Sequence, residues 1–128
     1  MREVLFIAAA GALGTLSRYA LSGVAQRITE TGFPLGTLSV NIIGSLLIGF
    51  FMQVGLNTDI IPHSARVIIT VGFLGAFTTF STFAYETARY LEAGEWLSGA
   101  LTIAANVLVC VLAVLLGMFL GRVAYGGI

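Results

Sequence analysis

Four long apolar segments, separated by short polar connections, constrain the fold of this chain more than any other feature. They cover residues 4–24, 35–56, 66–85 and 97–120 of the 128 residues. A helix needs about 20 mostly apolar residues to cross the hydrocarbon core of a bilayer. Each segment has roughly that length, and the connections are too short to form a domain outside the membrane. The sequence therefore predicts one all-α transmembrane domain of four spans over residues 1–128.

The scarcity of charged side chains supports a membrane location. Only 9% of the residues are charged and 58% are hydrophobic, whereas about a quarter of the residues in a soluble domain are charged. The formal net charge of zero argues against nucleic acid as a partner. The first apolar run is long for a signal peptide and is interpreted as a retained span. Most of the surface is therefore expected to face lipid or another copy of the chain.

The arginines are spread almost evenly between the two sides of the predicted membrane. The chain has no lysine, and its arginines lie on one side (Arg2, Arg66, Arg122), on the other side (Arg27, Arg89) and within the first span (Arg18). An excess of Lys and Arg on one side normally sets the orientation of a membrane protein. The near balance predicts insertion in both orientations. The alternative is that a span boundary is misplaced or the rule is overridden.

Two stripes of hydrogen-bonding side chains follow the second and fourth spans. Each stripe repeats every four residues and so lies along one helix face; the members are Thr37, Asn41 and Ser45 in the second span, and Thr102, Asn106 and Cys110 in the fourth. Such stripes either line an aqueous track or hold helices together by hydrogen bonds within the membrane. The presence of two stripes in so small a protein favours a track.

The third span carries an unusual stretch, GFLGAFTTFSTF, over residues 72–83. Glycine and threonine are poor helix formers, and hydroxyl groups satisfy backbone groups that a helix break frees within a membrane. A broken third helix is therefore expected, and the ends of half-helices bind ions. Phe80 and Phe83 share a helix face. Aromatic rings have positive edges, so the pair is interpreted either as an anion contact or as plain packing.

The few charged residues near the spans do not form a pattern typical of an enzyme. Arg18 either extends to the membrane interface or lies in a vestibule that attracts anions, and Glu86 follows the third span as an interfacial charge. The sequence shows no metal-binding cluster of His, Cys and Glu and no pair of a nucleophile with a base. The chain is therefore predicted not to be an enzyme.

The segments GTLSVN (residues 36–41) and GFLGAFTTFSTF (residues 72–83) resemble those of the Fluc fluoride channels, also called the CrcB family. The resemblance extends over the length of the chain. It implies an antiparallel, dual-topology homodimer with two pores in the bacterial plasma (inner) membrane. The implied activity is passive, selective export of fluoride.

The resemblance also assigns expected roles to individual residues. Asn41 matches the pore asparagine, and Phe80 and Phe83 match the rings whose edges contact fluoride. The other expected pore residues carry hydroxyl or amide groups and are Thr37, Ser81, Thr82, Thr102 and Asn106. At the positions of Thr102 and Asn106, family members often have Tyr and Ser. This chain therefore keeps the hydrogen-bonding capacity there but lacks any role specific to a tyrosine hydroxyl.

The resemblance implies a cation and two charged positions as well. Gly75 and Thr78 match the positions whose backbone carbonyls, from both subunits, hold a structural Na⁺ at the dimer axis. Arg18 matches the arginine of the first span, expected in a vestibule, and Glu86 matches the acidic residue that follows the second Phe.

Two other functions remain open from the sequence. A small multidrug antiporter is also a four-span, dual-orientation dimer, but its proton-coupled transport requires a carboxylate in the first span. This chain has Arg18 there. The other alternative is a subunit of a membrane assembly that transports nothing, which predicts no ion flux from the purified protein.

Overall fold

The computed structural model describes residues 1–126, and these form helices and short connections without a strand. The helices are α1 (Arg2–Thr29), α2 (Leu35–Asn57), α3 (His63–Val67), η1 (Ile68–Leu74), α4 (Gly75–Phe77), α5 (Phe80–Glu92), α6 (Trp96–Ala104), η2 (Ala105–Val109) and α7 (Cys110–Ala124). They make up 4 runs long and apolar enough to cross a membrane: Arg2–Thr29, Leu35–Asn57, His63–Glu92 and Trp96–Ala124. The predicted all-α protein with four spans is confirmed.

The helices extend beyond the apolar segments at several ends. The first helix continues through polar residues to Thr29, beyond the predicted span over residues 4–24. The third run continues to Glu92, beyond the predicted span over residues 66–85. Hydropathy marks where a helix contacts lipid, whereas Ala, Gln, Arg and Glu continue a helix equally well outside it. The connections are therefore shorter than the sequence indicated.

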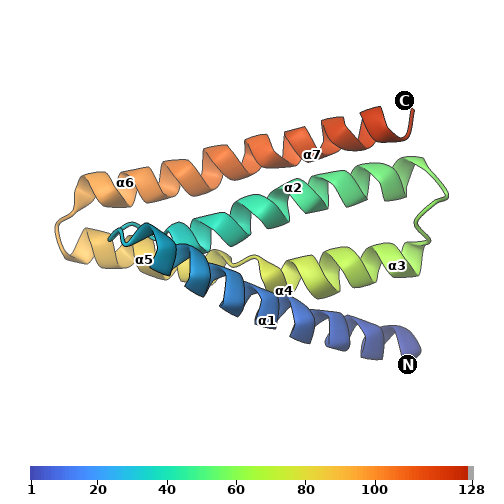
Figure 1. Cartoon of the computed structure of the whole chain (residues 1–128), viewed down its shortest axis with the longest axis horizontal. Helices are drawn as coiled ribbons and strands as arrows, with labels where there is room; N and C mark the ends of the chain where they lie inside the picture. Colours follow the sequence, from blue (N-terminus) through green and yellow to red (C-terminus); the bar gives the residue numbers. More distant parts are fainter. Residues whose placement is uncertain (127–128) are drawn as a thin grey trace.

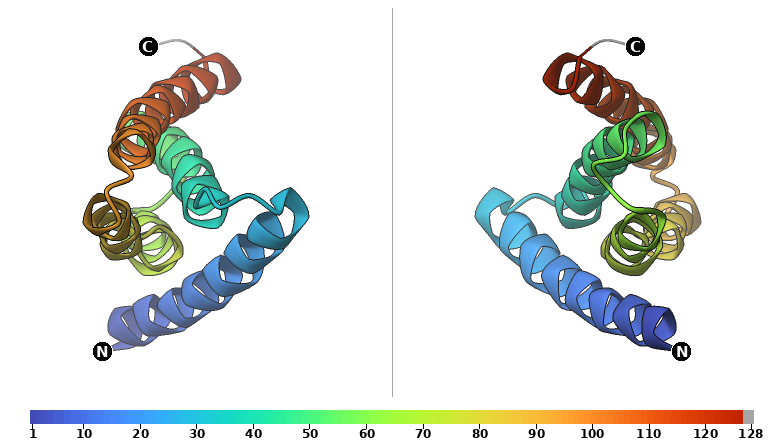
Figure 2. Two further views of the ribbon diagram at one scale, coloured as in Figure 1. Left: turned by 90° about the vertical axis from the view of Figure 1, so that its left-hand side faces the viewer. Right: turned by 90° about the vertical axis from the view of Figure 1, so that its right-hand side faces the viewer.

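The four runs lie side by side, and both described chain ends lie at the same end of the bundle (Figure 1). Helix α2 packs along α7 through glycines. A Cβ atom at Gly49 would overlap the backbone of Val114, and one at Gly117 would overlap that of Leu46. These glycines let the two backbones approach closely, as small residues do in membranes. Helix α1 crosses the bundle obliquely and packs on η1 and α4 (Figure 2).

The third run is interrupted at Thr78 and Thr79, which both have extended backbone conformations. The hydroxyl groups at the interruption satisfy backbone atoms on either side. Thr78 donates from both its backbone N–H and its Oγ1 to the carbonyl of Leu74, each over 3.0 Å. Thr79 is the N-cap of α5, and its Oγ1 accepts from the N–H of Thr82 over 3.2 Å. Threonine suits both positions because its hydroxyl caps a helix and its branched Cβ favours extended backbone.

Candidate ion pathway

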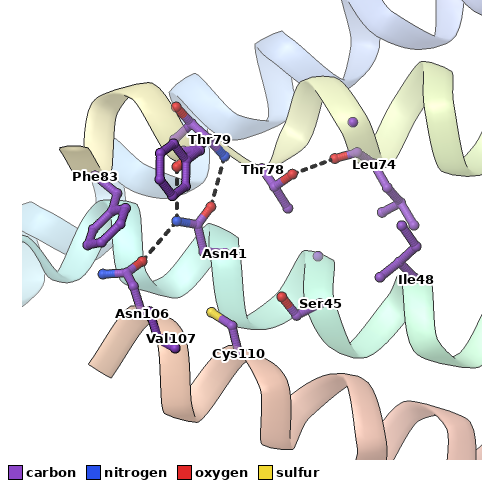
Figure 3. A pocket seen from close by; sticks show the side chains of 13 residues that line it. Asn41, Ser45, Ile48, Leu74, Thr78, Thr79, Phe83, Asn106, Val107 and Cys110 are labelled. Atoms are coloured by element: carbon purple, nitrogen blue, oxygen red, sulfur yellow. Dashed lines mark hydrogen bonds between the residues drawn. The ribbon is translucent and has the colours of Figure 1, made fainter. Parts of the chain in front are cut away.

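An open cavity of about 280 Å³ lies where the interrupted third run faces α2 and the fourth run (Figure 3). Its lining includes six of the residues expected to form the site: Asn41, Gly75, Thr78, Phe80, Phe83 and Asn106. Ser45 and Cys110, which continue the two polar stripes, line it as well. The interruption, both stripes and both phenylalanines therefore meet at one place.

Asn41 is the centre of a hydrogen-bond network at one end of this cavity (Figure 3). Its Nδ2 donates to the carbonyl of Thr79 over 3.0 Å and to Oδ1 of Asn106 over 2.9 Å. Its Oδ1 accepts from the N–H of Thr79 over 2.8 Å. Asn106 in turn donates from Nδ2 to the carbonyl of Thr102 over 3.1 Å. The second and fourth runs are thus both tied to the interruption in the third.

The two phenylalanines form an edge-on pair beside the network. The ring centroids of Phe80 and Phe83 are 5.3 Å apart, and the ring planes are at 71°. Phe83 is buried, with an exposed fraction of 7%, whereas Phe80 is 78% exposed. In this arrangement Phe83 completes the wall of the cavity, and Phe80 presents most of its ring to whatever covers the chain on that side.

The polar residues one helical turn away lie outside the cavity. Thr37 donates from Oγ1 to Oε1 of Glu86 over 2.7 Å. Thr102 is completely buried and donates to the carbonyl of Ser98 over 2.8 Å. The Oε2 atom of Glu86 is buried and has no hydrogen-bond partner within residues 1–126. Along α2, Asn41 therefore lies between the cavity residue Ser45 and a second polar group that contains a carboxylate.

The remaining expected hydroxyls lie at the start of α5. The Oγ1 atom of Thr79 donates to that of Thr82 over 2.9 Å and lies 3.5 Å from Oγ of Ser81. Ser81 is exposed, and neither it nor Thr82 lines the cavity. These hydroxyls satisfy the backbone of the interruption, and Ser81 faces outward from the single chain.

Arg18 contacts the end of the first half of the third run. Its Nε donates to the carbonyl of Ala76 over 3.0 Å. The interruption frees this carbonyl, because the next turn of helix that would have satisfied it is missing. A positive side chain at the C-terminal end of a helix is also favourable for the helix dipole. Arg18 is therefore held by the protein rather than extended freely to the membrane interface.

The backbone carbonyls at the interruption include those expected to bind a cation. The N–H of Thr79, which in a continuous helix would donate to the carbonyl of Gly75, donates to Asn41 instead. Gly75 is exposed and lines the cavity. The hydroxyl of Thr78 donates to the carbonyl of Leu74 within its own chain. Residues 1–126 hold no cluster of His, Cys, Asp and Glu suited to a metal.

Two residues that shape the site were not predicted from the sequence. Thr79 supplies the backbone atoms that fix the amide of Asn41. Its position just before a helix start, where threonine is a preferred cap, was the sequence signal that could have identified it. Gly44 lies against the interruption, since a Cβ atom there would overlap the γ-methyl group of Thr78. No sequence signal distinguished Gly44 from the other glycines of the spans.

Comparisons with known proteins agree with this picture. The family model described as "CrcB-like protein, Camphor Resistance (CrcB)" matches residues 5–118. A protein of Geobacter metallireducens named fluoride-specific ion channel FluC is 48% identical over 122 residues, covering 95% of this chain and 98% of that protein. A protein of the same name from Dehalococcoides mccartyi is 46% identical, and the match covers 94% of this chain and 93% of that protein. Another from Syntrophotalea carbinolica is 48% identical, and the match covers 94% of this chain and 98% of that protein. These matches confirm the resemblance inferred from the sequence, and the chain belongs to the CrcB family.

Proposed function

We propose that this chain is a fluoride-selective channel that lets fluoride leave the cell passively. The observation that carries the proposal is the convergence of Asn41, Phe83 and Asn106 on one cavity at the interruption of the third run. Relatives that match nearly the whole chain are named fluoride-specific ion channels. An ion channel makes and breaks no covalent bonds, so the chain is not an enzyme.

The chemistry of the cavity suits a small anion. Stripping water from an anion requires hydrogen-bond donors or positive edges placed closely around it. The hydroxyl of Ser45 supplies a donor, and Asn41 supplies one when a bond of its amide opens. The edges of the Phe80 and Phe83 rings supply partial positive charge without a fixed charge that would hold the ion in place. The apolar remainder of the wall keeps competing water away.

The two alternative functions fit less well. Proton-coupled antiport needs a carboxylate deep in the first span, where this chain has Arg18 bonded to the carbonyl of Ala76. A subunit that transports nothing would not need polar side chains around an open cavity within the membrane, where each one is costly. The nearly complete matches to proteins named as channels favour conduction over both.

We propose further that two copies of the chain form an antiparallel homodimer with two pores. Extended backbone at membrane depth is tolerated only where protein or water covers it. In the single chain Gly75, Phe80 and Ser81 are all exposed next to the interruption. A second copy placed over this face would cover them and close the open side of the cavity. The balanced arginines allow the two copies to insert in opposite orientations.

The same dimer would create a site for a structural Na⁺ at its axis. Carbonyl oxygens of Gly75 and Thr78 from both copies would hold the ion, and neutral oxygens of this kind suit a hard cation. The displaced Thr79 N–H, which leaves the Gly75 carbonyl without its helical partner, supports this assignment. When bound, the ion would supply positive charge that holds the two interruptions together. For a bacterial protein of this class we propose the plasma (inner) membrane.

Flux from liposomes tests the proposal. Purified protein is reconstituted in vesicles loaded with equal fluoride and chloride, and the release of each ion is followed with a selective electrode under a K⁺ potential. We expect rapid fluoride release with chloride retained. Release of both ions at similar rates would exclude a fluoride-selective channel, and release of neither would favour the assembly subunit.

A further inference from the structure

The hydrogen bonds of Asn41 leave it without a free N–H group. A primary amide has two N–H donors, and Asn41 uses one on the carbonyl of Thr79 and the other on Oδ1 of Asn106. An anion that reaches this point therefore finds no donor on Asn41 unless one of the two bonds opens. The geometry thus demands a rearrangement before Asn41 can contact an anion.

The network also fixes the orientation of the Asn106 amide. Its Nδ2 donates to the carbonyl of Thr102 over 3.1 Å, so its oxygen faces Asn41. If the amide were turned over, its N–H groups would face those of Asn41, and its oxygen would face the carbonyl of Thr102. Neither pair can form a hydrogen bond, so the network excludes that orientation. Asn106 therefore presents an acceptor to the cavity, and an acceptor repels an anion.

The bond between Asn41 and Asn106 is the weaker of the two links. Thr79 holds Asn41 with a pair of bonds, N–H to Oδ1 and carbonyl to Nδ2, so opening that link breaks two bonds together. The link to Asn106 is a single bond between neutral side chains, which is worth little in net free energy. Asn106 also lies in η2, a π-helical segment, and such segments often occur at functional sites.

We propose that the Asn41–Asn106 bond is a latch across the pathway. It lies beside Phe83 at one end of the cavity (Figure 3). One helical turn along α2 from Asn41, Thr37 is bonded to Glu86. An arriving fluoride displaces Oδ1 of Asn106 and accepts a hydrogen bond from the freed N–H of Asn41. The Asn41–Asn106 bond forms again after the ion has passed. Asn106 is then a positioning residue that acts through Asn41. This inference rests on the proposed fluoride conduction and adds a step to it.

Substitutions at Asn106 test the latch in opposite directions. Asn106→Ala removes the acceptor and leaves one N–H of Asn41 free, so fluoride release should become about 2- to 10-fold faster, the factor expected for one neutral hydrogen bond. Asn106→Asp keeps an acceptor and adds charge, which strengthens the bond and repels the anion, so release should slow by tenfold or more. Leu108→Ala is the matched control, since Leu108 lies in the same segment and is 61% exposed; its rate should equal that of the unmodified protein.

The readouts separate a latch from a ligand and from a widened pore. With Asn106→Ala, chloride should still be retained, and the side-chain amide NMR signal of Asn41 should respond to lower fluoride concentrations than in the unmodified protein. If Asn106→Ala is poorly folded, Asn106→Ser serves in its place because its hydroxyl is too short to reach Asn41. An unchanged or slower fluoride rate in the folded variant would overturn the latch, as would chloride release that accompanies the gain. If the unmodified protein releases no fluoride, the proposed function itself fails; if it does and only these variants disagree, the latch alone fails.

Discussion

Replacing Asn41 with aspartate changes the hydrogen-bonding character of the site with almost no change in volume. The carboxylate only accepts hydrogen bonds, so the bonds to the Thr79 carbonyl and to Oδ1 of Asn106 are both lost. Each neutral bond contributes about 0.5–1.5 kcal/mol, so we expect Asn41→Asp to destabilise the fold by about 1–3 kcal/mol. A membrane protein with four packed runs should tolerate this loss and remain assembled.

The effect on fluoride flux should be much larger. A fluoride ion that took the place of Asn106 Oδ1 would lie next to the new carboxylate. Two negative charges about 4 Å apart repel each other by about 4 kcal/mol at an effective dielectric constant of 20. That energy corresponds to a reduction in rate of roughly 1,000-fold. We therefore predict near-complete loss of flux with little loss of assembly.

Liposome release measured with a fluoride electrode, together with gel filtration, tests this prediction. Asn57→Asp is the control, because it makes the same chemical change at the end of the same helix, where Asn57 is exposed and donates to the carbonyl of Gln53. The control should conduct normally. Asn41→Asp with nearly normal flux would refute the reasoning and leave Asn41 as a contact between helices.

Three further predictions concern the rings, the orientation and the cation. Phe80→Leu or Phe83→Leu removes a ring edge, so flux should fall steeply, and assembly should persist because such swaps usually cost less than about 1.5 kcal/mol of stability. Phe119→Leu on the exposed face of α7 should have no effect, and normal flux in the double variant would refute edge contact. Glu30→Lys with Thr31→Lys, both exposed, should force one orientation and abolish flux until an oppositely biased copy is co-expressed; full activity alone would contradict dual insertion. Replacing Na⁺ with a large organic cation should weaken activity or assembly, and a measurable Na⁺ current would contradict a structural role.

The spans and the interruption were predictable because they depend on local sequence. Apolar length specifies a membrane helix, and the run of glycine and hydroxyl residues over 72–83 marked where the third helix breaks. The four-residue spacing of Thr37, Asn41 and Ser45 placed them on one face. The extent of each helix was less predictable, because α1 and α5 continue through polar residues outside the apolar segments.

The detailed connections of the site depend on contacts between distant parts of the chain. Asn41 was expected to be a pore residue, but nothing in the sequence indicated that its N–H donors bond to Thr79 and Asn106, which lie 38 and 65 residues away. Arg18 was expected at the interface or in a vestibule, and neither interpretation indicated that its Nε donates to the carbonyl of Ala76, 58 residues away. Sequence spacing along one helix carries no information about such pairings, because they depend on how the helices cross.

The reversal potential of a single-channel or bilayer current tests the central claim most directly. With a tenfold gradient of fluoride, equal chloride on both sides and no pH gradient, a passive fluoride channel should reverse at about 59 mV, the potential equivalent to a tenfold ratio of a monovalent ion. Changing the chloride gradient or the pH on one side should leave that potential unchanged. A reversal potential that follows chloride, or one that shifts with the proton gradient, would contradict a passive fluoride-selective channel.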